Sequence, residues 1–291
     1  MKLFWILLFF LTTIQAEEKT LMRAGYVLEG TSAAVSRDMK AGYEFISKRF
    51  SKHYNVETDV IFLKSHDDAI ASFKQGELDY IAMPLATFAP YYQEFIPYEG
   101  LVFLSGNGND ILQPYITLVR KEDPSSLSSY AGKRAAHDEN NINTDIYMDM
   151  LTLNLADKHS REMFNLVSTP TPQRAVLMLF FNQADIAFVP VTSWETVKTM
   201  NPTLEQKLKI IDKSPSVFGY GIEIYRKNLP RNVLEDMIRM NNDLTRSEDG
   251  KQLMRIMKAK KRSLIEPNQI PSYIDYYLQY ETLLKRHEKK K

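Results

Sequence analysis

Residues 69–87 read AIASFKQGELDYIAMPLAT, and residues 175–193 read AVLMLFFNQADIAFVPVTS. Each stretch predicts a helix that ends at a Gly or Asn turn and is followed by a short apolar strand. The strand starts beside an aspartate (Asp79 or Asp185), stops at a proline, and is followed by a hydroxyl residue. We interpret the two stretches as one supersecondary unit used twice, which indicates two similar α/β lobes.

The chain before the first copy extends the same alternation. Residues 21–28 read as a buried strand, Ala41–Phe50 carries apolar residues at helical spacing, and Val56–Leu63 alternates as a strand does. The order is therefore β-α-β-α-β, with short connections. This order predicts an α/β fold with a largely parallel sheet that is covered by helices.

Two further apolar stretches bracket the second copy. Pro114–Arg120 and Gly219–Arg226 both read as strands. We therefore expect the chain to leave the first lobe near residue 115, build the second lobe, and return near residue 220.

The expected divisions are residues 17–115 with 220–266 for lobe 1, residues 116–219 for lobe 2, and residues 267–291 for a C-terminal helical tail. The tail ends in HEKKK, and we expect this basic end to be frayed and solvated, as chain termini usually are.

The N-terminal residues 1–16 have the features of a signal peptide. Lys2 gives a positive start, Leu3–Leu11 is apolar, and Ala16 is a small residue at the expected cut before Glu17. The apolar run is too short for a comfortable membrane span, which needs about 20 residues. We predict a cleaved signal peptide and export to the periplasm, with an uncleaved anchor as the alternative.

The composition excludes several classes of protein. The chain has 37 basic and 36 acidic side chains, so it lacks the basic excess with which a general nucleic-acid binder neutralises phosphates. It has no cysteine, which excludes disulfides, thiolate zinc sites, iron–sulfur clusters and cysteine nucleophiles. Its five histidines are scattered without metal-ligand spacing, so we expect neither a metal nor another cofactor.

Sequence motifs of common enzymes are absent. The chain has no GxSxG, no HExxH, no P-loop and no GxGxxG after a strand. We therefore assign no catalytic residue and predict a binding protein rather than an enzyme. A hydrolase whose catalytic groups are scattered along the sequence is the remaining enzymatic alternative.

An ordered set of segments gives the chain a family resemblance. The set consists of Gly25–Ser32, the block at residues 69–87, Tyr115–Val119, Leu127–Arg134, the block QADIAFVPVTSWE and the return strand GYGIEIYRKNLP. Over residues 21–265 it resembles a type II periplasmic solute-binding protein, and more closely the phosphate/phosphonate-binding branch of the ABC transporter substrate-binding proteins. The resemblance implies a two-lobed fold in which each lobe is a mostly parallel sheet flanked by helices, joined by two crossover strands.

The same resemblance implies a function. Such a protein closes its lobes on a small polar ligand, here an oxyanion such as phosphate, phosphite or a phosphonate, and delivers it to an ABC permease. The alternative is a sensory periplasmic binding protein that signals ligand occupancy to a membrane receptor. In either case we expect a monomer that binds a small molecule and no nucleic acid.

Two rules select the candidate ligand-binding residues. Ligands of open α/β sheets lie beyond the carboxyl ends of the strands, and helix N-termini there offer free N–H groups to an anion. In lobe 1 these rules select Tyr26, Gly30, Thr31, Ser32 and Thr87. In lobe 2 they select His137, Asn141, Asn143, Thr144, Thr171 and Thr192. The alternative is helix capping for the hydroxyl residues and a place in the core for the tyrosine.

The loop DENNINT at residues 138–144 carries the central expectation. The phosphate/phosphonate branch usually has a Ser/Thr-rich, Gly-containing anion loop here, whereas this chain has Asn141, Asn143 and Thr144. Amides and a hydroxyl bind oxyanions, and they also bind sugars, amino acids and other neutral polar ligands. Acidic side chains nearby would oppose a dianion unless they point away. We predict that replacing Asn141 and Asn143 by alanine weakens ligand binding without unfolding the protein.

Overall fold

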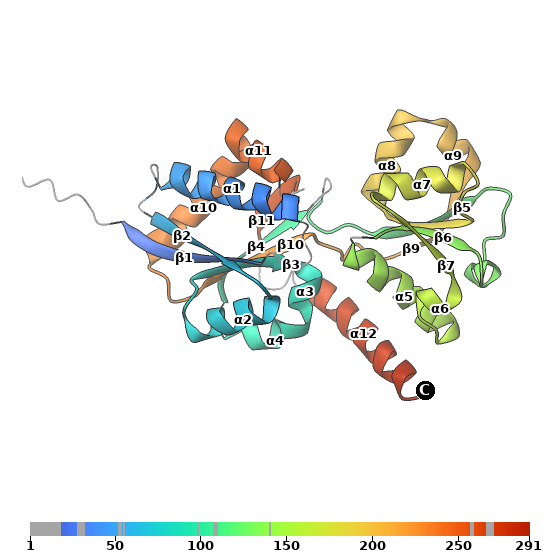
Figure 1. Cartoon of the computed structure of the whole chain (residues 1–291), viewed down its shortest axis with the longest axis horizontal. Coiled ribbons are helices and arrows are strands. Elements are labelled where there is room, and N and C mark those ends of the chain that lie inside the picture. The colour runs from blue at the N-terminus through green and yellow to red at the C-terminus, as the bar shows by residue number, and fades with distance from the viewer. Residues whose placement is uncertain are drawn as a thin grey trace, which may run out of the picture.

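Two separate β-sheets organise the chain in the computed structural model (Figure 1). The structure describes residues 19–27, 33–51, 54, 56–97, 99–106, 110–139, 141–256, 259–265 and 271–291. We call the six-stranded sheet with its helices lobe 1 and the five-stranded sheet with its helices lobe 2. The expected signal peptide and the candidate residues Gly30, Thr31 and Ser32 lie outside the described residues. No helix in the described part of the chain is long and apolar enough to cross a membrane.

The sheet of lobe 1 has the strand order β11-β4-β10-β3-β1-β2. Its strands are β1 (Thr20–Val27), β2 (Val56–Leu63), β3 (Tyr80–Pro84), β4 (Glu99–Gly106), β10 (Gly221–Arg226) and β11 (Lys261–Leu264). β1 pairs in parallel with β2 and β3, as the β-α-β-α-β order requires. β10 runs antiparallel between β3 and β4, and β11 is antiparallel to β4. Two strands from late in the sequence therefore complete the sheet that the N-terminal part begins.

Helices cover both faces of this sheet (Figure 1). One face carries α1 (Ala33–Phe50), α10 (Arg231–Arg246) and α11 (Glu248–Ile256). The other carries α2 (His66–Gln75), α3 (Leu85–Phe88), the 3-10 turn η1 (Ala89–Tyr91) and α4 (Tyr92–Phe95). The ends of α2 follow from its sequence, because Ser65 accepts a hydrogen bond from the Asp68 N–H and Gly76 ends the helix with a φ of 84°.

The sheet of lobe 2 has the strand order β7-β6-β8-β5-β9. Its strands are β5 (Tyr115–Arg120), β6 (Arg134–Asp138), β7 (Asn165–Thr169), β8 (Ile186–Pro190) and β9 (Leu208–Lys213). β6 is parallel to β7 and β8, whereas β5 is antiparallel to β8 and β9. Its helices are α5 (Ile142–Ala156) and α6 (Ser160–Met163) on one face, α7 (Pro172–Phe180), α8 (Val191–Met200) and α9 (Thr203–Lys207) on the other, and the 3-10 turn η2 (Leu127–Tyr130).

The two copies of the repeated unit occupy equivalent places in the two lobes. Asp79 accepts hydrogen bonds from the backbone N–H of Arg23 at 2.9 Å and from its guanidinium at 3.1 Å. Asp185 accepts the same set from Arg134, at 3.0, 3.1 and 2.9 Å. Each aspartate thus fixes the start of a central strand to its parallel neighbour. The repeated aspartates have a structural role, and the geometry agrees with one unit used twice.

Two crossover connections join the lobes. The connection that leaves lobe 1 leads into β5, which pairs with β8, and the connection that returns leads into β10, which pairs with β3. Between the lobes the connections bond to each other: the Gln113 N–H donates to the Phe218 carbonyl at 3.0 Å, and the Phe218 N–H donates to the Gln113 carbonyl at 3.1 Å. The two-lobed α/β architecture with two crossover strands is therefore confirmed, with antiparallel strands added to each parallel set.

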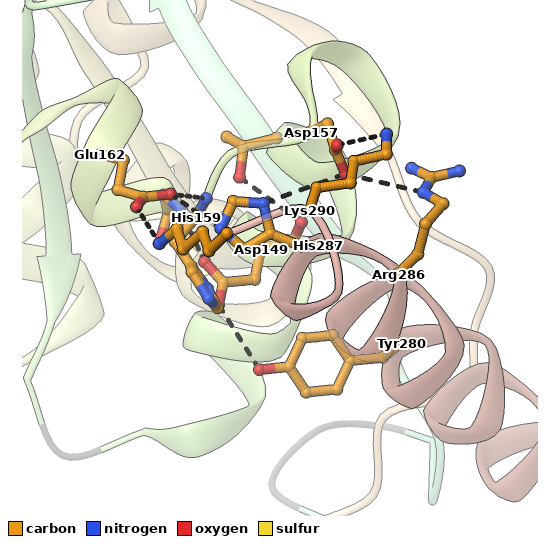
Figure 2. Close-up of polar contacts among 11 residues, drawn as sticks. Asp149, Asp157, His159, Glu162, Tyr280, Arg286, His287 and Lys290 are labelled. Carbon is orange, nitrogen blue, oxygen red and sulfur yellow. Dashed lines mark hydrogen bonds and ion pairs between the residues drawn. The ribbon is translucent and has the colours of Figure 1, made fainter.

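The C-terminal tail is a docked helix, α12 (Pro271–Glu288), rather than a frayed end. It starts beside lobe 1 and ends next to α5 and α6 of lobe 2 (Figure 1). Lys290 pairs with Asp157 and Lys291 with Glu162, each at 2.6 Å, in a cluster of charges shown in Figure 2. The expectation of a frayed end was wrong because acidic residues far away in the sequence pair with the basic side chains, whereas Lys290 and Lys291 are solvated as expected, with 61% and 57% of their side chains exposed.

Candidate functional site

Three parallel strands of lobe 2, in the order β7-β6-β8, end at one edge of the sheet. α5 begins just after β6, α7 just after β7, and α8 directly after β8. The positive ends of three helix dipoles therefore lie along this edge. The edge is next to the crossover connections, since the Thr192 hydroxyl in the first turn of α8 donates to Gln113 Oε1 at 2.7 Å.

Side-chain hydrogen bonds surround the first turn of α5. Asn141 caps the helix: its Oδ1 accepts from the Asn143 N–H at 3.2 Å, and its Nδ2 donates to the Tyr115 hydroxyl at 2.8 Å. The buried Tyr115 hydroxyl also has a hydrogen bond with the Thr144 side chain. Thr144 is buried and donates to the Asp138 carboxylate at 2.6 Å. The sequence analysis proposed Asn141 and Thr144 but not Tyr115, which comes from the crossover strand β5.

Asn143 has a different role from the one that its sequence position suggested. Its side chain is buried; Nδ2 donates to the Gly219 carbonyl at 3.0 Å, and Oδ1 accepts from the Tyr273 hydroxyl at 3.2 Å. Both ends of the amide are thus used within the protein, and Asn143 links α5 to the return connection and to α12. Replacing Asn141 and Asn143 together by alanine would also reduce stability, because it leaves the buried Gly219 carbonyl without its donor.

His137, at the end of β6, is a buried neutral imidazole. Its Nε2 lies 3.4 Å from Ser168 Oγ, and its Nδ1 lies 3.7 Å from Asp145 Oδ1. Burial lowers the pKa of His137, so the ring can exchange hydrogen bonds but brings no positive charge at neutral pH. Within the described ranges, no three His, Cys, Asp or Glu side chains form a group that could hold a metal ion.

Asp145 is the negative side chain nearest to this imidazole, and 54% of its side chain is exposed. Partial desolvation, together with the charges of Asp149 and Asp138, raises its pKa to about 6. The carboxylate is still ionised at neutral pH. It therefore opposes the binding of an anion at the first turn of α5.

Asp145→Asn is expected to raise the melting temperature by a few degrees at about pH 7.5 and by less at about pH 4. The folded carboxylate titrates at about pH 6 and an unfolded one near pH 4, so the folded protein binds the extra proton between these values. The stability that this proton brings is complete below about pH 4 and is lost as the pH rises through about 6. The effect is small because solvent screens a half-exposed side chain.

Melting curves of both proteins at the two pH values measure this effect. Glu57→Gln, which neutralises an exposed carboxylate on β2, is the control and should change neither value. An equal gain at both pH values, or a loss at pH 7.5, would contradict the assigned pKa of Asp145.

The two remaining lobe 2 candidates lie in the first turns of helices. Thr171 caps α7, because its Oγ1 accepts from the Arg174 N–H at 3.3 Å. Thr192 is bonded to Gln113, as described above. α8 starts after Pro190, and no side chain caps it. Its first turn therefore keeps N–H groups that favour an anion.

Tyr26 of lobe 1 belongs to the core, which was the alternative considered for it. Its ring stacks on that of Tyr43 in α1, with centroids 3.6 Å apart, and lies 5.5 Å from the ring of Tyr80. These rings line a small cavity of about 60 Å³ together with Glu223 and Arg262. The side chain of Tyr26 packs on the face of the sheet that α1 covers. To contact a solute beyond the strand end, the side chain would have to point away from this face.

Thr87 is half-buried on α3, just past the end of β3. The first residues of α3 and α8 make equivalent hydrogen bonds to the crossover connections. The Leu85 N–H donates to the Tyr220 carbonyl, and the Val191 N–H donates to the Pro114 carbonyl. Thr87 and Thr192 therefore occupy equivalent places in the two copies. Contact of either one with a solute stays a prediction.

A family model matches most of the chain. The family described as "ABC transporter, phosphonate, periplasmic substrate-binding protein" matches residues 31–269. The chain belongs to this family. The family resemblance predicted from the sequence is thus confirmed. No curated protein sequence is significantly similar to the chain.

Solved structures of periplasmic binding proteins share the fold. XAC2383 from Xanthomonas citri, bound to ATP, is 11% identical with a TM-score of 0.60, over 92% of this chain and 99% of that chain. PhnD1 from Prochlorococcus marinus, in complex with methylphosphonate, is 14% identical with a TM-score of 0.56, over 90% of this chain and 98% of that one. A binding protein component of an ABC phosphonate transporter from Pseudomonas aeruginosa is 14% identical with a TM-score of 0.53, over 92% and 89%. At these identities the likeness shows the fold alone.

Membership of the phosphonate-type periplasmic substrate-binding family defines the general role of this protein. Members are non-enzymatic proteins that bind small molecules and deliver them to ABC permeases. The prediction that the chain is not an enzyme is therefore confirmed. The family is periplasmic.

Proposed function

We propose that this protein captures a small oxyanion, such as phosphate, phosphite or a phosphonate, between its lobes and delivers it to an ABC permease. The observation that carries the proposal is the shared edge of β7, β6 and β8, where the N-termini of α5, α7 and α8 gather. Helix N-termini stabilise an anion through their N–H groups and dipoles, without a dedicated lysine.

Polar side chains around this edge supply further hydrogen bonds. Without a solute, Asn141 donates to Tyr115 and Thr192 donates to Gln113. An oxyanion can exchange with these internal acceptors at little net cost, because bonds between protein groups are replaced by bonds to a charged acceptor.

Lobe 1 contributes the other wall of the proposed site. Thr87 on α3 is equivalent to Thr192 on α8, so the repeat supplies a hydroxyl from each side. Gly30, Thr31 and Ser32, which follow β1 in the sequence, are proposed to add further donors. Binding then favours the closed arrangement, in which both lobes contact the solute, through bending of the crossover connections near residues 115 and 220.

Export precedes this function. We propose that residues 1–16 direct the chain across the inner membrane and are removed, and that the mature protein works as a periplasmic monomer. Residues 1–16 contain one lysine and no acidic residue, so the rest of the chain has equal numbers of acidic and basic side chains. A neutral protein does not attract anions over long distances, and local donors must therefore provide selectivity.

Thermal melting of residues 17–291 with a panel of solutes tests the proposal. The panel contains phosphate, phosphite, methylphosphonate, 2-aminoethylphosphonate, sulfate, amino acids and sugars. A solute at 100 times its dissociation constant stabilises the protein by about 2.7 kcal/mol, which corresponds to about 5–10 °C for a chain of this size. A shift with one or more phosphorus oxyanions is expected. A shift with only a neutral or cationic solute would keep the family and reject the oxyanion.

A further inference from the structure

α12 reaches the candidate site of lobe 2 through one side chain. Tyr273, in the first turn of α12, is 1% exposed and donates its hydroxyl to Asn143 Oδ1 at 3.2 Å. Asn143 is the second residue of α5 and follows the cap residue Asn141 by two positions. A helix from the end of the chain therefore bonds to the turn that presents its N–H groups at the solute edge.

The orientation of the Asn143 amide links the bond from Tyr273 to the first turn of α5. Its Nδ2 donates to the carbonyl of Gly219, which can only accept, so its oxygen must face a donor. The Tyr273 hydroxyl is that donor. The backbone N–H of Asn143 in turn donates to Asn141 Oδ1, the atom that caps the helix. Movement of the Asn143 side chain would therefore disturb the cap and the direction of the first-turn N–H groups.

The ring of Tyr273 is held against the crossover connection. It lies 5.9 Å from the ring of Phe218, and Tyr276 on the same helix places its ring 5.1 Å from Phe218 on an edge-to-face contact. Phe218 is the residue that bonds to Gln113 between the lobes. The start of α12 thus packs on the segment about which the lobes bend.

The far end of α12 is fastened to lobe 2 by charges (Figure 2). Lys290 pairs with Asp157 and Lys291 with Glu162, each at 2.6 Å. The Tyr280 hydroxyl donates to Asp149 at 3.4 Å, halfway along the helix. These contacts fix α12 on α5 and α6, so Tyr273 keeps its place relative to Asn143.

We propose that Tyr273 is a positioning residue of the solute site, which acts through Asn143 on the first turn of α5. The inference rests on the proposed function, because it assumes that this turn presents N–H groups to the solute. It assigns Tyr273 no contact with the solute. It also explains why α12 is packed on the crossover and fastened at its far end.

A double-mutant cycle on residues 17–291 tests the proposal, with inorganic phosphate as the probe in calorimetric titrations. Tyr273→Phe removes only the hydroxyl and is expected to weaken phosphate binding by about 3- to 10-fold, the range that one hydrogen bond provides. In the Asn143→Ala background the same change is expected to have no further effect, because its target is gone. Tyr276→Phe is the matched control, since it also loses one hydroxyl from a ring on Phe218, and should bind phosphate as the unmodified protein does.

A second measurement is independent of any solute. The side-chain amide signal of Asn143 in a ¹H–¹⁵N spectrum, assigned by its loss in Asn143→Ala, should shift in Tyr273→Phe and stay in place in Tyr276→Phe. Unchanged phosphate affinity in Tyr273→Phe, or equal weakening in both backgrounds, would overturn the positioning role. An unmodified protein that binds no oxyanion of the panel would reject the oxyanion function instead. In that case an unshifted Asn143 amide in Tyr273→Phe still overturns the inference, and a shifted one supports it, with the cycle repeated using the panel solute that stabilises most.

Discussion

Replacing Glu223 by alanine is expected to lower the free energy of unfolding by about 3–5 kcal/mol, because it leaves a buried guanidinium without its counter-ion. Glu223 on β10 and Arg262 on β11 are each 6% exposed. Arg262 donates Nε to Oε1 at 2.7 Å and Nη2 to Oε2 at 2.6 Å, and the Tyr80 hydroxyl adds a third bond at 2.7 Å. Burial lowers the pKa of Arg262, and the charge of Glu223 raises it. The guanidinium stays charged in the variant because arginine is effectively always protonated in proteins.

The melting temperature should fall by about 6–20 °C, at about 2–4 °C per kcal/mol for chains of 150–250 residues. Glu235→Ala is the matched control: Glu235 pairs with Arg231 on the surface of α10, where the side chains are 55% and 92% exposed. Such a pair contributes at most about 0.5 kcal/mol. A loss below about 1 kcal/mol in Glu223→Ala would show that water enters the lobe 1 cavity and solvates the arginine.

Asn141→Asp is expected to weaken phosphate binding by about 100-fold while the protein keeps its stability. Aspartate caps a helix as well as asparagine does and suits the positive end of α5. The aspartate carboxylate can also accept a hydrogen bond from the Tyr115 hydroxyl, whereas the Asn141 amide donates one to it. The added charge repels an anion at about 5 Å by about 3 kcal/mol with an effective dielectric constant of about 20, which corresponds to the stated loss of affinity.

Asn201→Asp provides the control for this charge. Asn201 accepts a hydrogen bond from the Thr203 N–H at 3.2 Å, much as Asn141 accepts from Asn143, but it lies at the opposite end of α8 from the solute edge. Titration calorimetry with phosphate should give the unmodified affinity for Asn201→Asp. Equal affinities in all three proteins would place the solute away from the first turn of α5. An unchanged affinity for a sugar or an amino acid in Asn141→Asp, with no phosphate binding, would indicate a neutral ligand.

The parts of the fold that were predictable depend on local patterns. The repeated unit at residues 69–87 and 175–193 contains the turn that ends each helix and the aspartate at which each strand starts, so these features could be predicted from the local sequence. The bonds of Arg23 to Asp79 and of Arg134 to Asp185 join strands that are neighbours in the sheet, although another strand lies between them in the sequence. The carboxyl ends of parallel strands then locate Asn141 and Thr192 by topology alone.

The parts that were not predictable depend on contacts between distant segments. Asn143 has no local feature that separates it from Asn141, and its role follows from partners at Gly219 and Tyr273. Tyr26 lies close to a strand end, but strand alternation alone did not show which face α1 would cover. The ion pairs of the basic C-terminus could not be predicted, because its partners, Asp157 and Glu162, belong to lobe 2 and lie far away in the sequence.

The position of β10 in the sheet of lobe 1 has a consequence for the order in which the chain folds. β10 lies between β3 and β4, so β4 has no link to the N-terminal strands until β10 has been synthesised. All strands of lobe 2 precede β10 in the sequence, and their sheet needs no later residue. Lobe 2 can thus assemble on a nascent chain whose first lobe is still open. Lobe 1 completes its sheet only after β10 and β11, residues 221–226 and 261–264, have been made.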